Sequence, residues 1–331
     1  MSVMPRRPRR TIQIVSHGPS CLDGVMAAAA IRRFYPDDRV LATLAANGDT
    51  DRVIQSVRSA SSGGAEELWI TDLSWTQTET AGHLTSVIKS GARAYWIDHH
   101  RTAVGRADAP EFEVPFTERV LSEEYSAALL TYNFLSAKAE RDGDHQHLAS
   151  YRKFAPFAAI ADDHDRWIHR IPASADWALA VQTLGGIESY REIIRLDEPV
   201  MSRRLKLALE AGLKAMDKSY AIAKSTMVER ELDNGIRVRS ACCMGYSSEV
   251  ASRLYEGQHR TVIALFDLRS LGVSLRRSAD CQVDLSELAR SFGGGGHAAA
   301  AGFAVDEVKL APAERLADVL GAKLLNERRP N

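Results

Sequence analysis

Three features that mark specialised classes of protein are missing from this sequence. Its 331 residues include only 4 cysteines, and its 42 basic residues nearly balance the 43 acidic ones. No apolar run approaches the roughly 20 residues that a membrane-spanning helix needs. The charge balance argues against the strongly basic surface that grips long duplex nucleic acid, although a local basic groove is compatible with it.

The cysteines and the first residues of the chain bear on the compartment. Cys242 and Cys243 are adjacent, which is poor geometry for a mutual disulfide. The opening segment MSVMPRRPRR is basic, but a strand-like segment follows it instead of the apolar core of a signal peptide. We therefore expect a short disordered tail, reduced thiols and a cytoplasmic location.

The first half of the chain alternates short apolar runs with helical patterns. Strands are predicted at 11–18, 39–45, 67–75 and 92–100, with helices at 21–36, 50–60 and 78–91 between them. This alternation predicts an α/β fold in which helices cover both faces of a parallel sheet.

A long helix is expected to join this sheet to a smaller C-terminal α/β domain. It is predicted from Pro199 to about Ser225, with one apolar face made by Leu205, Leu209, Leu213, Met216 and Tyr220. The other predicted elements are helices at 118–140, 147–162, 247–256 and 312–327 and strands at 236–243, 261–268 and 271–278. We expect a first domain at 1–195, a linker helix at 196–230 and a second domain at 231–331.

Several predicted strands of the first domain end in acidic or imidazole side chains. The first strand ends at His17, the third leads to Asp72, and the fourth leads to Asp98, His99 and His100. Because ligands bind outside the carboxyl ends of parallel strands, we expect these groups to converge. The same region would receive Cys21 and Asp23 from the first turn, and one or more of Asp162, Asp163, His164 and Asp165 from a later segment.

This mixture of imidazoles and carboxylates suits Mn²⁺, Zn²⁺ or Fe²⁺ better than Ca²⁺, which prefers oxygen ligands alone. The candidates are more numerous than one metal needs. Two metals about 3.5–4 Å apart, sharing a carboxylate, would activate a water and hold a phosphoryl group. The pattern therefore favours a metal-dependent phosphoesterase.

The second domain carries a glycine-rich block, SFGGGGHAAAAGF at 291–303. We expect a loop there whose backbone N–H groups approach an anion closely. Just upstream, Arg276 or Arg277 follows a predicted strand and could grip a phosphate with its guanidinium group.

These segments resemble the motifs of the DHH/DHHA1 phosphoesterase superfamily. The run IDHH matches the motif that names the family, while SHGPSCLDG, TDLS and DHDRW are similar to its other metal-binding motifs. The run VSLRR and the later FGGGGHAAAAGF resemble its C-terminal substrate-binding domain. The resemblance covers nearly the whole chain and implies an active site in a cleft between two domains.

The resemblance also implies roles for individual residues. Two Mn²⁺ ions would be held, one by His17, Cys21 and Asp72, the other by Asp23, Asp72, His99 and Asp165. His100 would contact the substrate phosphate or the leaving oxygen, and Asp98 would orient its neighbours. The substrate's far end would be bound by Arg276, Gly294, Gly295, Gly296 and His297.

One residue departs from the pattern of many members, which have Asp at the position of Cys21. A thiolate there would favour Zn²⁺ or Fe²⁺ over Mn²⁺. Alternatively the thiol stays protonated and the first metal is held weakly. Asp163 remains an alternative to Asp165, which we prefer for its spacing from Trp167.

The leading hypothesis is hydrolysis of phosphodiester bonds in short oligonucleotides or dinucleotides. One alternative is a phosphoanhydride hydrolase acting on polyphosphate or pyrophosphate. Another is a nucleotide-sensing protein whose catalysis is weakened by Cys21. The expected partner is a short nucleic acid or nucleotide, without a membrane or long duplex DNA, and a homodimer is compatible with the sequence.

Overall fold

The computed structural model describes residues 9–46, 48–59, 63–255 and 259–304 and divides into two compact units. The first unit is Met1–Gly212 and the second is Leu213–Asn331, so the division falls inside helix α10, Arg203–Thr226. The predicted domain boundaries after residues 195 and 230 stay predictions. Each unit has a sheet of its own.

A five-stranded parallel sheet with the order β2-β1-β3-β4-β5 forms the first unit. The strands are β1 (Thr11–His17), β2 (Arg39–Ala45), β3 (Glu67–Thr71), β4 (Arg93–Asp98) and β5 (Glu118–Leu121). β3 is buried along its whole length, as is typical of a parallel strand covered on both faces. The predicted parallel α/β sheet is confirmed.

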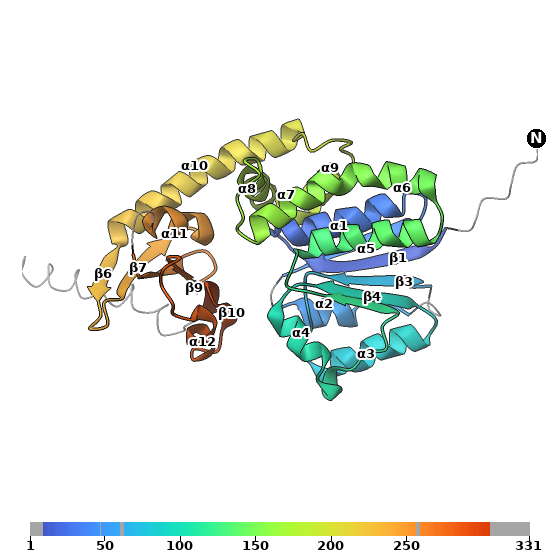
Figure 1. Ribbon diagram of the computed structural model, residues 1–331, viewed down its shortest axis with the longest axis horizontal. Helices are drawn as coiled ribbons and strands as arrows, with labels where there is room; N and C mark the ends of the chain where they lie inside the picture. Colours follow the sequence, from blue (N-terminus) through green and yellow to red (C-terminus); the bar gives the residue numbers. More distant parts are fainter. Residues whose placement is uncertain (1–8, 47, 60–62, 256–258, 305–331) are drawn as a thin grey trace, which may run out of the picture. The chain divides into compact units, whose positions relative to one another are not determined.

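Helices cover both faces of this sheet (Figure 1). One face packs against α1 (Leu22–Phe34), α5 (Ala127–Arg141) and α7 (Ala155–Asp165), and the other against α2 (Thr50–Gln55), α3 (Thr78–Lys89) and α4 (Arg101–Ala107). The remaining elements are η2 (Pro110–Phe112), α6 (His145–Tyr151), η3 (Arg152–Phe154), α8 (Ser174–Leu184) and α9 (Gly186–Ile193). Four consecutive alanines of α1, residues 27–30, are fully buried, so α5 and α7 can approach α1 closely.

Several predicted elements of this unit differ in extent from the structure. Residues 118–121 form the edge strand β5 instead of the start of a helix, and α5 begins only at Ala127. A strand of four residues is too short to show a period of two, and pairing with β4 decides its conformation. The helix predicted at 50–60 ends at Gln55, and the strand predicted at 67–75 ends at Thr71.

The long helix α10 forms as expected, but its buried face differs from the predicted one. Leu213 is 39% exposed, although the pattern places it on the apolar face. The buried residues are Leu205, Ala208, Gly212, Met216, Ser219 and Ala223. A Cβ at Gly212 would lie 2.4 Å from Oγ1 of Thr183 in α8. Small residues therefore make up much of this face, because they allow neighbouring segments to approach α10 closely. A prediction based on large apolar residues does not detect such a face.

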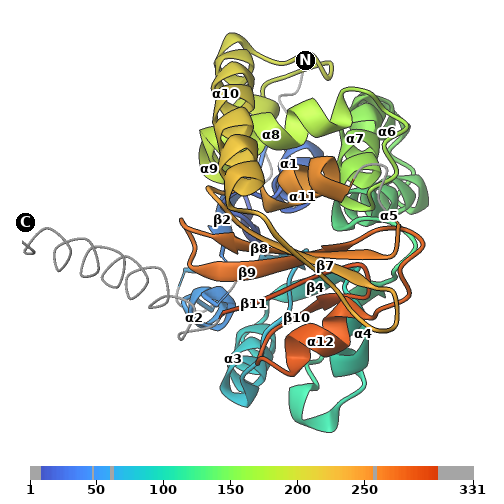
Figure 2. The same ribbon diagram turned by 90° about the vertical axis from the view of Figure 1, so that its left-hand side faces the viewer.

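The second unit contains a six-stranded mixed sheet with the order β10-β11-β9-β8-β7-β6 (Figure 2). Its strands are β6 (Val228–Glu231), β7 (Arg237–Cys243), β8 (Thr261–Asp267), β9 (Gly272–Arg277), β10 (Gly295–His297) and β11 (Ala300–Ala304). Helix α11 (Ser247–Tyr255) packs against β8 and β9, and α12 (Leu285–Arg290) packs against β10 and β11. The predicted smaller α/β domain is confirmed, while the helix predicted at 312–327 lies outside the described residues.

Candidate metal centre

The strand order places the candidate ligands at one edge of the first sheet. The chain leaves β1 toward β2 on one side, whereas β3 lies on its other side, so the order reverses beside β1. In open α/β sheets such a switch point, at the carboxyl ends of the strands, is where ligands bind. His17 ends β1, Asp72 follows β3, and Asp98 ends β4.

Asp72 lies at the middle of the cluster and offers one oxygen to each side. Its Oδ2 lies 3.4 Å from Nδ1 of His17 and 3.4 Å from Sγ of Cys21, the residue that precedes α1. Its Oδ1 lies 3.4 Å from Nε2 of His99. Asp72 has a positive φ of 58°, a conformation that is uncommon outside glycine and often marks functional turns.

His99 lies among three carboxylates. Its Nε2 is 3.4 Å from Oδ2 of Asp165, 3.7 Å from Oδ2 of Asp23, and 3.4 Å from Asp72. This buried nitrogen has no hydrogen-bond partner. Among the residues that the structure describes, potential ligand atoms within 4.8 Å of one another form three groups: His17 with Cys21 and Asp72; Asp72 with His99 and His100; and Asp23 with His99 and Asp165.

The electrostatics of the cluster fit a bound cation. Burial, together with the carboxylates of Asp72 and Asp165, raises the pKa of Asp23 well above its usual value. Burial alone would lower the pKa of His99, but the surrounding carboxylates raise it to about 10. Buried carboxylates gathered this closely are costly unless positive charge compensates them. A divalent cation would supply that charge, and the donors present are those of Mn²⁺, Fe²⁺ or Zn²⁺.

Cys21 is the one sulfur donor of the cluster formed by the described residues, and its protonated form is favoured. Burial raises the pKa of this thiol well above its usual value, and the nearby carboxylates of Asp72, Asp165 and Asp23 add to the effect. Without a cation the thiol therefore stays neutral beside Asp72. All four cysteines of the chain are free thiols in the structure.

Asp98 fixes the backbone and side chain that follow it. Its Oδ1 accepts the backbone N–H groups of His99 at 2.7 Å and His100 at 3.1 Å, and lies 2.7 Å from Nδ1 of His100. Burial would lower the pKa of His100, but Asp98 and Asp72 raise it to about 9. The geometry thus orients His100 through Asp98, while the catalytic roles of both residues stay predictions.

The acidic run at 162–165 divides between the centre and the scaffold. Only Asp165 joins the ligand cluster formed by the described residues. Asp163 binds the following turn, accepting hydrogen bonds from the backbone N–H of Arg170 at 2.7 Å and from Oγ of Ser174 at 2.6 Å. Asp162 accepts the backbone N–H of Ser126 at 2.7 Å. The geometry therefore favours Asp165 over Asp163 as a ligand candidate.

Asp23 has a second set of partners that the sequence did not reveal. Its two oxygens accept the backbone N–H groups of Ala127 and Ala128, both at 2.8 Å, at the start of α5. These N–H groups are among the four that every helix start leaves without an internal partner. Asp23 thus ties α5 to the centre across 104 residues, a separation that no local sequence pattern records.

The predicted substrate-binding residues all lie in the second unit. The Arg276 guanidinium donates to Oγ of Ser248 at 2.6 Å and to Oγ of Ser274 at 3.1 Å. Arg277 instead donates to the carbonyl oxygens of Ala298, at 3.1 Å, and Cys281. Both arginines therefore have backbone partners, because Arg276 also donates to the carbonyl oxygen of Leu275 at 2.7 Å.

The glycine-rich block is not the predicted loop, because part of it forms β10 and pairs antiparallel with β11. A Cβ at Gly294 would lie 2.2 Å from the carbonyl oxygen of Gly302, and one at Gly296 would lie 2.6 Å from that of Ala300. Close packing against β11 thus explains these two glycines. Gly295 has open space around its Cβ position, and the side chain of His297 is exposed.

Two comparisons bear on the identity of the chain. Residues 236–326 match the family model of the DHHA1 domain. Oligoribonuclease NrnB of Bacillus subtilis (strain 168) is 25% identical over 306 residues, which cover 87% of this chain and 72% of that protein. The C-terminal part of the chain therefore matches the DHHA1 domain family, and most of the chain is similar to an enzyme that carries the oligoribonuclease name.

Solved structures share the fold at low sequence identity. RecJ from Thermus thermophilus, solved in complex with Mn²⁺, has a TM-score of 0.58 and is 15% identical. The match covers 97% of this chain but only 53% of RecJ, so the chain spans about half of that protein's length. PggH from Vibrio cholerae, described as a pGpG-specific phosphodiesterase, has a TM-score of 0.51 and is 13% identical, with 95% of this chain and 99% of PggH covered.

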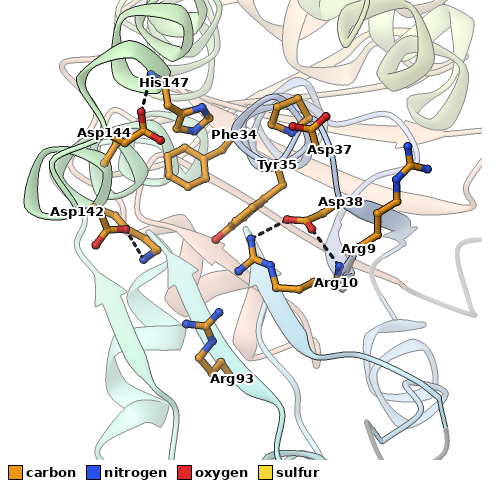
Figure 3. A pocket seen from close by; sticks show the side chains of 13 residues that line it. Arg9, Arg10, Phe34, Tyr35, Asp37, Asp38, Arg93, Asp142, Asp144 and His147 are labelled. Atoms are coloured by element: carbon orange, nitrogen blue, oxygen red, sulfur yellow. Dashed lines mark hydrogen bonds and ion pairs between the residues drawn. The ribbon is translucent and has the colours of Figure 1, made fainter. Parts of the chain in front are cut away.

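A pocket of about 750 Å³ lies at the opposite, amino-terminal edge of the first sheet (Figure 3). Three of its cations are paired with carboxylates: Arg10 with Asp38 at 2.7 Å, Lys138 with Asp142 at 3.1 Å, and Arg93 with Glu67. Internal pairing accounts for these charges, so we assign the pocket no ligand.

Every helix of the described residues is too short or too polar to cross a membrane.

Gly24 allows α1 to begin against the end of β1, so Gly24→Ala is expected to damage the centre. A Cβ there would lie 2.1 Å from the carbonyl oxygen of His17 and 3.0 Å from Oδ2 of Asp72. Relief requires backbone movement, so we expect about 1–3 kcal/mol lower stability and weaker Mn²⁺ binding. Thermal unfolding and calorimetric Mn²⁺ titration measure both effects.

The matched control is Gly82→Ala in α3, where a Cβ would meet no atom within 4 Å. That variant is expected to keep wild-type Mn²⁺ binding and to gain stability from the higher helix propensity of alanine. Wild-type Mn²⁺ affinity in Gly24→Ala would show that the contact between α1 and β1 does not shape the centre.

Proposed function

We propose that this protein is a metal-dependent phosphoesterase that hydrolyses phosphodiester bonds of short oligonucleotides or dinucleotides. The observation that carries the proposal is Asp72, whose two oxygens face two different groups of ligand candidates. That arrangement fits a shared carboxylate between two divalent cations. The similarity to oligoribonuclease NrnB supports short oligonucleotides as the substrate class.

His17, Cys21 and Asp72 would hold one cation, and Asp23, Asp72, His99 and Asp165 the other. Bound there, the cations would supply an activated water and offset the charge on the phosphoryl oxygens. The expectation of Mn²⁺ is supported by the imidazole and carboxylate donors, while Cys21 would shift the preference toward softer metals.

His100 would contact the substrate in this proposal. Its Nδ1 faces Asp98 at 2.7 Å, so a contact to a phosphoryl or leaving oxygen would be made by Nε2. The raised pKa of His100 keeps its imidazole protonated at neutral pH, a state in which both ring nitrogens donate. His100 would thus stabilise negative charge, and Asp98 would hold the ring in place.

In the second unit, we propose that Arg276 and the Gly294–His297 segment bind the substrate beyond the scissile phosphate. Arg276 is preferred for this role because the hydroxyl groups of Ser248 and Ser274 hold its guanidinium, whereas Arg277 donates to the carbonyl oxygens of Ala298 and Cys281. Ser248, at the start of α11, holds the Arg276 guanidinium in place. A substrate bound at such a point would be selected for its length.

The length preference gives the test of this function. With Mn²⁺ added to metal-stripped protein, kcat/KM for a diribonucleotide is expected to exceed that for a 30-nucleotide single strand at least tenfold. The measurement is the initial rate of product formation, followed by chromatography, with inorganic tripolyphosphate as a third substrate. A preference for the long strand would contradict the proposed substrate class, and a preference for tripolyphosphate would favour the phosphoanhydride alternative.

A sensing role is the second candidate, and the neutral thiol of Cys21 among the ligands is the observation that favours it. It predicts nucleotide binding without turnover in wild-type protein and the appearance of turnover in Cys21→Asp. Full turnover in wild-type protein would exclude this alternative.

A further inference from the structure

The turn after α7 exposes a large aromatic side chain two residues beyond the ligand candidate Asp165. Trp167 is 41% exposed. The other four tryptophans of the chain are at most 1% exposed, namely Trp69, Trp75, Trp96 and Trp177. Trp167 therefore differs from the other tryptophans, because burial in the core does not explain why a tryptophan stands at this position.

The backbone around Trp167 forms a helix-ending turn of the kind that usually contains glycine. The N–H of Ile168 donates to the carbonyl oxygen of Asp163 at 2.9 Å, and the N–H of Trp167 donates to that of His164 at 3.0 Å. These two bonds define a Schellman motif in which Trp167 occupies the left-handed position, with a φ of 57°. Glycine takes that conformation without cost, whereas a residue with a Cβ is strained in it.

This turn holds the indole in a fixed place. The carboxylate of Asp163 accepts the N–H groups of Arg170 and Ile171, at 2.7 and 3.1 Å, on the far side of the turn. The ring of His169 lies 4.3 Å from the Trp167 ring, centroid to centroid, and nearly perpendicular to it at 84°. The local structure thus presents a rigid, partly exposed aromatic surface at an unfavourable backbone position.

The location of that surface indicates its use. Asp165, with Oδ2 only 3.4 Å from Nε2 of His99, belongs to the candidate metal centre. Trp167 is two residues away, which places the two Cα atoms within about 7 Å of each other. A nucleoside attached to a phosphate at the centre could reach this ring. Aromatic side chains bind bases by stacking, with little preference among the bases.

We propose that Trp167 is a stacking platform for the nucleobase next to the scissile phosphate. The inference rests on the proposed phosphoesterase function and narrows it to substrates that carry a base, at the expense of polyphosphate. Trp167 would set specificity through binding, and Asp163 would be a positioning residue that acts through the turn.

The first test measures binding without turnover. Adenosine 5′-monophosphate, which has no phosphodiester bond to hydrolyse, is titrated into Mn²⁺-loaded protein while tryptophan emission is recorded. Stacking is expected to quench the emission of Trp167. The four other indoles are buried, so the ligand does not contact them and the change reports on Trp167. The quenching should vanish in Trp167→Gly. Emission that does not change when the nucleotide is added, or equal quenching in the variant, would overturn the proposal.

The second test distinguishes a loss of base stacking from a loss of protein stability. Trp167→Gly relieves the left-handed strain, so its melting temperature is expected to equal or exceed that of the wild type. Its KM for a diribonucleotide should rise roughly tenfold, whereas Trp167→Phe, which keeps an aromatic ring, should stay within about threefold of the wild type. For a dinucleotide analogue with abasic sugars, kcat/KM should be the same in all three proteins.

These outcomes distinguish the failure of the inference from the failure of the proposed function. Wild-type hydrolysis with an unchanged KM in Trp167→Gly would overturn the platform and leave the phosphoesterase in place. Quenching by nucleotide without any hydrolysis would support the platform and overturn the enzyme.

Discussion

Asp72→Asn is expected to remove nearly all hydrolytic activity and to lower the number of bound metal ions. Both oxygens of Asp72 face ligand candidates, and asparagine keeps one neutral acceptor in place of the charged pair. Bound metal stabilises charge in the transition state by several kcal/mol, and each 1.36 kcal/mol is a tenfold change in rate. We therefore expect kcat to fall by roughly a thousandfold or more. Single-turnover kinetics and metal analysis of the purified protein measure the two effects.

The matched control is Asp163→Asn, which removes a second buried carboxylate close to the centre. Asp163 binds the turn at 170–174, so its loss is expected to lower stability by about 1–3 kcal/mol. Metal content should stay at the wild-type value. If Asp72→Asn keeps its metal and its rate, Asp72 is not a ligand shared between two cations.

Asp98→Asn is expected to lower kcat by about 10–100-fold with little change in metal content. Its Oδ1 holds the imidazole of His100, and loss of such an outer partner has effects of that size. The charge of Asp98 also supports the protonated form of His100, so the variant loses both orientation and charge. Steady-state kinetics should show the loss in kcat, with KM changed by less than about threefold.

A double variant tests whether Asp98 acts through His100. If it does, Asp98→Asn should cost little once His100 is alanine, because the group it orients is gone. Additive losses in the double variant would show that Asp98 contributes by another route.

The strand ends of the first unit could be predicted because local patterns determine them. The run RVLATLA forms β2 with the expected bounds, TIQIVSH forms β1 one residue shorter than expected, and AYWIDHH forms β4 followed by the polar turn. Alternation of strands and helices fixes a parallel sheet, whose carboxyl ends share one edge. The convergence of His17, Asp72 and His99 follows from that topology alone.

Other features depend on contacts between distant segments and were missed. The hydrogen bonds from the start of α5 to Asp23 join residues 104 positions apart, and β5 is a strand because β4 lies beside it. The glycines at 294 and 296 suggested a loop, yet close packing against β11 requires them within or beside a strand. Tertiary contact decided the outcome in each case, and single-sequence patterns carry no record of such contacts.

Adding Mn²⁺ back to metal-stripped protein, beside a His99→Ala control, tests the central claim most directly. His99 lies among Asp23, Asp72 and Asp165, so its loss should weaken binding of one cation while the group at His17 and Cys21 persists. We predict that wild-type protein hydrolyses a diribonucleotide only after Mn²⁺ is added, and that His99→Ala binds fewer ions and does not hydrolyse it. Turnover that persists without metal, or at the wild-type rate in His99→Ala, would contradict the account.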